Sequence, residues 1–178
     1  DVTQEDRSAV IRQAIQGMLD GGEEGAFTAA GLPNLKVLSG KCGFQVAKDE
    51  MEAAWGWERA KALLQKEGHR IPFGMLTVTN NTGGGQPVSM ANIRAYAALL
   101  KKYGKPFIMD VCRFSENAMF IKMREPGYEN TPIRDIVKEM FSYADGATMS
   151  AKKDGMVNIG GFIVLRSEEW LDAVRNGL

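Results

Sequence analysis

The run Pro106-Phe107-Ile108-Met109-Asp110 decides how the middle of this 178-residue chain folds. It is apolar without interruption up to its final aspartate, which is typical of a short strand covered on both faces. Outward from this run, in both directions, the sequence alternates between segments of strand type and segments of helix type. Strands that alternate with helices predict an α/β fold with a largely parallel sheet.

The individual elements follow from apolar periodicity and from cap and turn residues. Strands are predicted at residues 73–79, 106–110, 146–149 and 162–165. Helices are predicted after Ser89 up to Gly104, at residues 116–124 and 133–144, and after Ser167. In the first third of the chain, the sequence predicts a helix with an apolar stripe over residues 10–19, a strand at residues 35–38 and a helix at residues 48–66.

The composition excludes several classes of protein. The chain is 44% apolar and 25% charged, which is typical of a globular protein rather than a disordered one. Because 22 basic residues balance 22 acidic ones, we expect no nucleic-acid partner and no binding to an anionic membrane. Apolar runs are too short to span a bilayer, and no secretory leader is recognisable. Two isolated cysteines, Cys42 and Cys112, fit a cytoplasmic, reduced protein without a zinc site.

Polar side chains follow the predicted strand ends, where ligands bind in parallel sheets. Asn81, Asp110 and residues 150–153 all lie just past such ends. A lysine amine at a strand end can form a Schiff base, and a nearby carboxylate can keep a pyridine nitrogen protonated. These two requirements together predict a site for pyridoxal phosphate.

Each of these residues also has an ordinary structural interpretation. Asp110 could cap a helix or pair with Arg113, whose own alternative is a surface ion pair. Paired lysines in a loop are usually solvated charges. The glycines after Asn81 fit a simple strand-to-helix turn, since they form neither a Walker loop nor a dinucleotide fingerprint. A nucleotide-binding α/β domain is therefore disfavoured.

Five ordered motifs go beyond periodicity. They are GGQPVSMAN (84–92), ENAMFIK (116–122), MFSYADG (140–146), MSAKKD (149–154) and NIGGF (158–162). Together they closely resemble the tryptophanase and tyrosine phenol-lyase family of pyridoxal-phosphate-dependent β-eliminating lyases. The resemblance implies that residues 63–178 are part of the large domain of a fold-type-I, aminotransferase-like enzyme. Residues 1–62 form an unmatched N-terminal segment of helix and loop.

By position, the resemblance implies that Lys153 is the Schiff-base lysine and that Lys152 supports it. Asp110 would pair with the pyridine nitrogen of the cofactor. Lys153, once released from the cofactor, would remove the α-proton of the substrate.

The resemblance also implies the remaining contacts. Asn81 and Arg113 would contact the 3-oxygen of the cofactor ring, and Ser150 would contact the phosphate. Asn158 would contribute a carbonyl to a potassium ion. Cys112 stands where relatives carry a small residue such as threonine or alanine.

The implied reaction is β-elimination of an aromatic amino acid, tryptophan or tyrosine, to pyruvate, ammonia and indole or phenol. A homo-oligomer is expected because relatives build their sites between subunits. Relatives are considerably longer than this chain. The alternative is therefore a truncated or degenerate homologue that acts as a non-catalytic binding or oligomerisation module, with its first helix as the partner surface.

Overall fold

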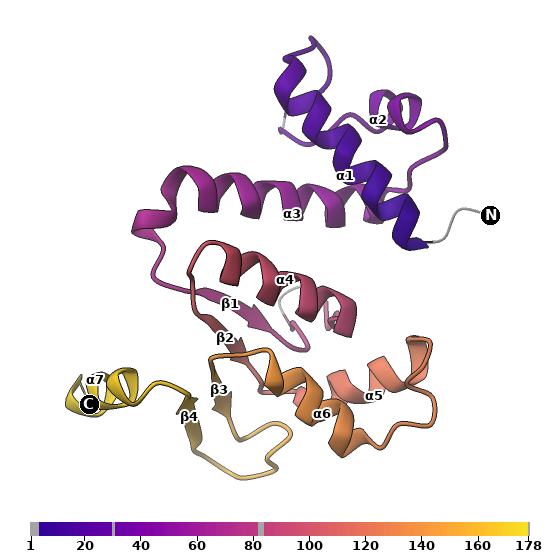
Figure 1. The fold of residues 1–178 in the computed structure, drawn as a ribbon. Helices are drawn as coiled ribbons and strands as arrows, with labels where there is room; N and C mark the ends of the chain where they lie inside the picture. The colour runs from indigo at the N-terminus through magenta and orange to yellow at the C-terminus, as the bar shows by residue number, and fades with distance from the viewer. Residues whose placement is uncertain (1–3, 30, 82–83, 178) are drawn as a thin grey trace. The chain divides into compact units, whose positions relative to one another are not determined.

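The computed structural model describes residues 4–29, 31–81 and 84–177, and the chain divides into two compact units, residues 1–68 and 69–178 (Figure 1). The first unit is built from helices, and the second carries the sheet. The division lies shortly after the boundary that the resemblance placed between residues 62 and 63.

The first unit consists of three helices, which are α1 (Gln4–Gly21), α2 (Leu35–Cys42) and α3 (Lys48–Glu67). Its core is formed by apolar side chains from all three helices and from the loops between them, which are Ile11, Ile15, Met18, Ala26, Leu38, Val46, Met51 and Ala54. The predicted stripe on α1 is therefore confirmed in its centre, whereas Val10 and Leu19 at its borders are exposed. The helix predicted at residues 48–66 is confirmed as α3, which a short 3₁₀ turn (Gly68–Arg70) follows.

The strand predicted at residues 35–38 is wrong, because this segment starts helix α2. Asn34 caps the helix: its side-chain oxygen accepts from the N–H groups of Lys36 (3.1 Å) and Val37 (3.5 Å). Gly43 ends the helix in the left-handed conformation, with φ +73°. The two cap residues, one at each end, favour the helix more strongly than the apolar residues of this segment favour a strand.

The second unit has one four-stranded sheet in the order β1-β2-β3-β4, in which β1, β2 and β3 run parallel and β4 is antiparallel to β3. The strands are β1 (Gly74–Thr77), β2 (Phe107–Asp110), β3 (Gly146–Ser150) and β4 (Gly161–Leu165). The helices are α4 (Met90–Lys102), α5 (Phe114–Arg124), α6 (Ile133–Ser142) and α7 (Glu168–Gly177). The predicted α/β fold with a largely parallel sheet is confirmed.

The three parallel strands end side by side. Thr77 pairs with Asp110, and Asp110 pairs with Thr148 on the next strand. The ladder continues past the strand ends, since Val78 N–H donates to the Asp110 carbonyl (3.0 Å) and Val111 N–H donates to the Thr148 carbonyl (2.9 Å). The segments that follow β1, β2 and β3 consequently lie at one edge of the sheet.

The central strand is covered on both faces, as its uninterrupted apolar run predicts. Phe107 and Met109 are 1% exposed and Ile108 is 8% exposed. The ring of Tyr96 on α4 contacts Phe107 edge-on, with 5.4 Å between the ring centroids. By contrast, β4 at the sheet edge is exposed along most of its length.

Strand β4 approaches the end of β3 so closely that its first residue must be glycine. Gly161 pairs with Ser150, and a Cβ atom at Gly161 would lie 2.2 Å from the carbonyl oxygen of Met149. No side chain fits at that distance from a backbone atom. The glycine thus sets how the antiparallel strand meets Ser150.

Helices α4 and α6 are joined by a polar cluster around Glu139. Arg94 on α4 donates to the Glu139 carboxylate and, at 2.9 Å, to the Tyr143 hydroxyl. The Tyr128 hydroxyl donates to both Glu139 carboxylate oxygens (3.1 Å). Partial burial alone would raise the pKa of Glu139, but the hydrogen bonds from Arg94 and Tyr128 outweigh it, so the pKa lies below its ordinary value of 4.5.

This cluster predicts a pH-dependent loss of stability in Glu139→Gln. Because the folded-state pKa lies below the unfolded one, the carboxylate stabilises the fold fully above pH 4.5 and loses this effect as the pH falls through the folded-state pKa. We expect the variant to be about 1 kcal/mol less stable than the unchanged chain at pH 7, in urea unfolding, and the difference to shrink as the pH is lowered below 4.5. Glu169→Gln, on an exposed position of α7, is the control. A difference of the same size above and below pH 4.5 would contradict the prediction.

Candidate functional site

A hollow of about 620 Å³ opens between the segment after β1 and helix α5. Its lining residues come from the segment after β1, from the N-cap residue of α5 and from α5 itself, and are Thr79, Asn81, Gly85, Arg113, Ser115, Glu116, Met119, Phe120 and Met123. Two of the predicted site residues, Asn81 and Arg113, are thus brought together although they are far apart in the sequence. Helix α5 also contributes apolar side chains to the lining, among them the exposed Met119 and Met123.

The turn that carries Asn81 is closed by backbone hydrogen bonds. Asn80 N–H donates to the Gln86 carbonyl (3.0 Å), and Gly84 N–H donates to the Asn81 carbonyl (3.1 Å). Gly84 and Gly85 both have positive φ, +84° and +75°, which explains why glycines occupy this turn. Residues 82 and 83 of the predicted glycine-rich turn lie outside the described residues.

Asp110 and Arg113 make separate contacts. The Oδ1 atom of Asp110 accepts from the N–H of Cys112 (3.2 Å), whereas the Arg113 Nε lies 3.9 Å from a carboxylate oxygen of Glu116. The surface ion pair that was the structural alternative for Arg113 exists, and its partner is Glu116 rather than Asp110. Within the described ranges, Asp110 Oδ2 has no hydrogen-bond donor or cation beside it.

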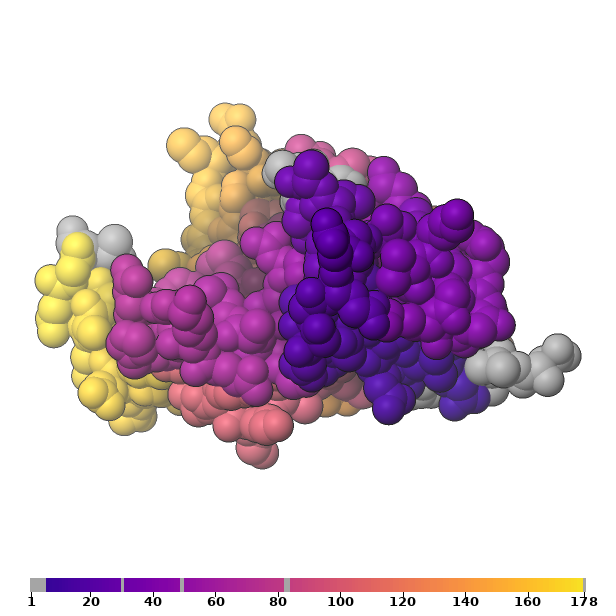
Figure 2. Space-filling view, turned by 90° about the horizontal axis from the view of Figure 1, so that it is seen from above, coloured from indigo at the N-terminus to yellow at the C-terminus, as the bar shows by residue number. Residues whose placement is uncertain are grey.

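The lysine pair lies in the long connection from β3 to β4. Ser150 is the last residue of β3, Lys153 is half-buried and Lys152 is exposed. Neither lysine side chain forms an ion pair or a hydrogen bond with the part of the chain that the structure describes. Figure 2 shows this connection, in light orange, standing out from the molecular surface. The amine of Lys153 is therefore available for chemistry.

The segments after β2 and β3 are tied to each other by Cys112 and Asp154. The sulfur of Cys112 accepts from the N–H of Ser150 (3.2 Å), and its carbonyl accepts from the N–H of Asp154 (3.3 Å). The Asp154 carboxylate accepts in turn from the N–H of Ser115 (2.7 Å). Asp110 and Arg113 are thus held on one framework with Ser150 and Lys153, although only Asn81 and Arg113 line the hollow.

Asn117, for which local sequence patterns predict no role, organises the other side of the site. It is fully buried on α5, where its Oδ1 accepts from Val88 N–H (2.8 Å) and its Nδ2 donates to the Val88 carbonyl (2.9 Å). The Thr79 hydroxyl also donates to Oδ1 (3.4 Å). Asn117 consequently joins the two ends of the turn that carries Asn81. One signal in the sequence could have indicated this role: the amide of Asn117 lies on the same buried face of α5 as Ala118 and Ile121.

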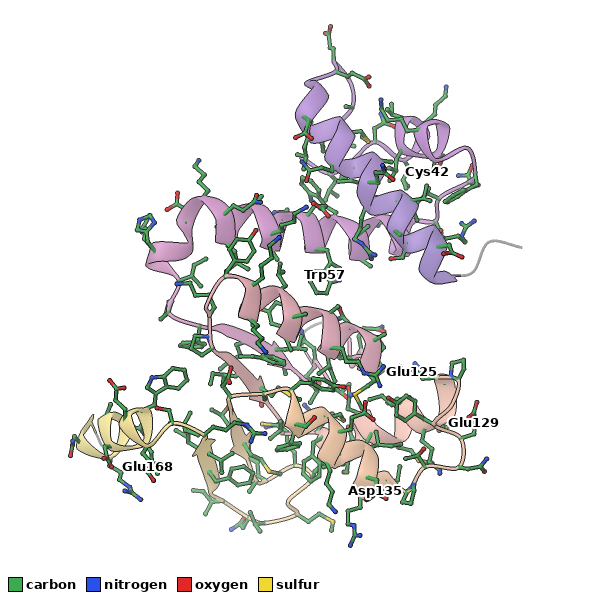
Figure 3. All side chains as sticks on the ribbon, in the orientation of Figure 1. Cys42, Trp57, Glu125, Glu129, Asp135 and Glu168 are labelled. Atoms are coloured by element: carbon green, nitrogen blue, oxygen red, sulfur yellow. The ribbon has the colours of Figure 1, made fainter. Side chains whose placement is uncertain are left out.

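Glu125 supports the same turn at its far end. Its carboxylate accepts from the N–H of Met90, the first residue of α4, at 2.8 Å. Figure 3 places the labelled Glu125 beside the start of that helix. Helix α5 and its C-cap residue therefore hold the start of α4 through two side chains, Asn117 and Glu125.

Asn158 lies apart from these residues. It is exposed in the connection between β3 and β4 and does not line the hollow.

In the described ranges, no three side chains of histidine, cysteine, aspartate or glutamate are grouped closely enough to hold a metal ion. None of the helices in those ranges combines the length and the apolar character needed to cross a membrane.

Comparison with known proteins identifies the relatives of this chain. The chain matches the family model described as β-eliminating lyase over residues 31–176, a match that begins well before Leu63. Tryptophanase of Salinibacter ruber is 59% identical over 121 residues, which cover 68% of this chain and 26% of the relative. Tyrosine phenol-lyase of Clostridium tetani is 54% identical over 109 residues, which cover 61% and 24%. Tryptophanase of Rhodobacter capsulatus is 52% identical over 120 residues, which cover 67% and 26%.

The chain therefore spans about a quarter of the length of these curated relatives. Its mostly parallel sheet and its helices are those of the large domain of a fold-type-I enzyme. With a family match over most of its length and relatives above 50% identity, the chain belongs to the β-eliminating lyase family.

Proposed function

We propose that this chain supplies the pyridoxal-phosphate-binding part of a lyase that eliminates the side chain of tryptophan or tyrosine. The products would be pyruvate, ammonia and indole or phenol. The observation that carries the proposal is the placement of Asp110 and Ser150 at the ends of adjacent strands, with Lys153 three residues beyond Ser150. The names of the relatives, tryptophanase and tyrosine phenol-lyase, support the same class of reaction.

The donor set at this edge of the sheet fits the cofactor. Asp110 offers a carboxylate oxygen, Oδ2, that has no partner within the described ranges and could face the pyridine nitrogen. Ser150 would donate its hydroxyl to the phosphate. Asn81 and Arg113, which share the hollow, would contact the ring oxygen. Lys153 would hold the cofactor covalently through its unpaired amine.

The side chains would then divide the work of the reaction. Bound pyridoxal phosphate supplies an electron sink for the negative charge that develops at the α-carbon of the amino acid. Lys153 would take the proton from that carbon, and Asp110 would hold a proton on the ring nitrogen. Lys152, next in the chain, would support Lys153. Asn158 would contribute a single carbonyl, which is not a cation site by itself, so no step is assigned to potassium.

Titration of the chain with pyridoxal phosphate, followed by visible absorbance, tests this proposal. We expect a visible band, and about tenfold weaker binding in Asp110→Ala, because the variant lacks a charge-assisted hydrogen bond to the ring. Asp135→Ala, on an exposed part of α6, is the matched control and should bind as the unchanged chain does. A folded chain without a band, or equal binding by Asp110→Ala, would contradict the proposal.

The second candidate is a non-catalytic binding or oligomerisation module. It is favoured by exposed apolar side chains on β4, which are Phe162, Ile163 and Val164. Pyruvate release from tryptophan and from tyrosine separates the two candidates. A visible band without pyruvate from either amino acid, together with a homo-oligomer in solution, would favour the module.

A further inference from the structure

Helix α5 begins without a cap of its own. Its N-cap residue is Arg113, whose side chain makes no capping hydrogen bond. The cap comes instead from Asp154, which lies 39 residues after Ser115 in the sequence. The Oδ2 atom of Asp154 accepts from the N–H of Ser115 (2.7 Å), from the Ser115 hydroxyl and from the N–H of Glu116 (3.4 Å). A carboxylate bonded to free N–H groups at a helix start is a strong, charge-assisted arrangement.

Asp154, which caps α5, directly follows Lys153 in the sequence. The backbone of Asp154 donates to the Cys112 carbonyl (3.3 Å), so both its main chain and its side chain are bonded to residues 112–116. On the other side of Lys153, Ala151 N–H donates to the Gly160 carbonyl (2.9 Å). The backbone that carries Lys153 is therefore held from both directions, and the bonds from Asp154 lead to the segment that contains Arg113.

We propose that Asp154 is a positioning residue that places Lys153 relative to Asp110 and Arg113. It would act by joining the lysine loop to the start of α5, without touching the cofactor. The use of this placement in catalysis rests on the proposed function, but the placement itself does not. A loop lysine without this support would sample many positions, at a cost in entropy when it must react in one of them.

The test compares the reactivity of Lys153 with that of its neighbour Lys152 in the chain without any cofactor. Trace acetylation with acetic anhydride, followed by fragment mass spectrometry, gives the ratio of label on the two amines. We expect Asp154→Ala to raise the ratio of label on Lys153 to label on Lys152 by about threefold. The reason is that Lys153 becomes as free as Lys152. Asp154→Asn retains an oxygen acceptor and should shift it by less than about twofold.

Two controls separate positioning from general stability. Glu139→Gln weakens the same unit at a place that makes no contact with the lysine loop, and it should leave the ratio unchanged. Ser115→Ala removes one of the three bonds and should give an intermediate shift, which decides the matter if Asp154→Ala does not fold. An unchanged ratio in folded Asp154→Ala, or in Ser115→Ala where Asp154→Ala is unfolded, would overturn the proposal. Because acetylation needs no pyridoxal phosphate, failure of cofactor binding leaves this result readable.

Discussion

Replacing Lys153 by alanine is expected to abolish covalent labelling of the chain by pyridoxal phosphate and borohydride at the proposed site. Borohydride reduces the imine between an amine and the cofactor to a stable bond, so the label marks the lysine that held it. Lys153 has an unpaired amine and lies beside the segment that contains Asp110. We expect at least about a tenfold loss of label from the peptide around residue 153, because hydrogen bonds of Ala151 and Asp154 hold the backbone of Lys153 at that edge of the sheet.

The matched control is Lys152→Ala, which removes an adjacent and more exposed amine. It should keep most of the label, because simple accessibility does not decide which lysine reacts at a built site. Peptide mapping by mass spectrometry measures both variants. Label of equal amount on Lys152 and Lys153, or label spread over surface lysines, would show that the loop has no preference and would remove Lys153 from the proposed mechanism.

Most of the second unit could be predicted because its signals are local. Apolar runs mark the strands, and serines mark the starts of two helices. Ser89 accepts from Asn92 N–H (3.1 Å), and Ser167 accepts from Trp170 N–H (3.3 Å). Because three of the four strands run parallel, the residues after their ends had to meet at one edge, which is where Asp110 and Ser150 lie.

The error at α2 has a simple physical cause. A run of four apolar residues fits a buried strand and one side of a short helix equally well. The deciding residues, Asn34 and Gly43, stand outside the run and act through the backbone at each end of the helix. Reading the caps before the apolar run would have predicted the helix.

The residues that support the site could not be predicted from local patterns. Asn117 bonds to Val88 across 29 residues, and Asp154 bonds to Ser115 across 39. Neither spacing is a period of helix or strand, so only the folded chain shows these partners. The roles implied for Asn81, Arg113, Ser150 and Lys153 came from a family resemblance and stay predictions until the cofactor is tested.

Asn117→Ala is expected to cause the largest loss of stability in the second unit, about 2–4 kcal/mol of unfolding free energy. The amide forms two hydrogen bonds with the backbone of Val88 and one with Thr79, and it is 0% exposed. Alanine would leave the buried N–H and carbonyl of Val88 without their partner, and a buried unpaired polar group is costly. Native-state hydrogen exchange of the β2 amides measures this loss in the second unit alone.

Asn176→Ala, at an exposed position on α7, is the matched control and should change the stability by less than about 0.5 kcal/mol. Asn117→Asp adds a sharper test, since a carboxylate can accept from Val88 N–H but cannot donate to its carbonyl. It should therefore also destabilise the unit. Loss of the hydrogen bonds between Asn117 and Val88 also frees the turn that carries Asn81, so pyridoxal phosphate should bind more weakly. The ratio of acetylation on Lys153 and Lys152 should stay unchanged. A change in that ratio would mean that the two halves of the site are coupled through α5, which contacts both Val88 and Asp154.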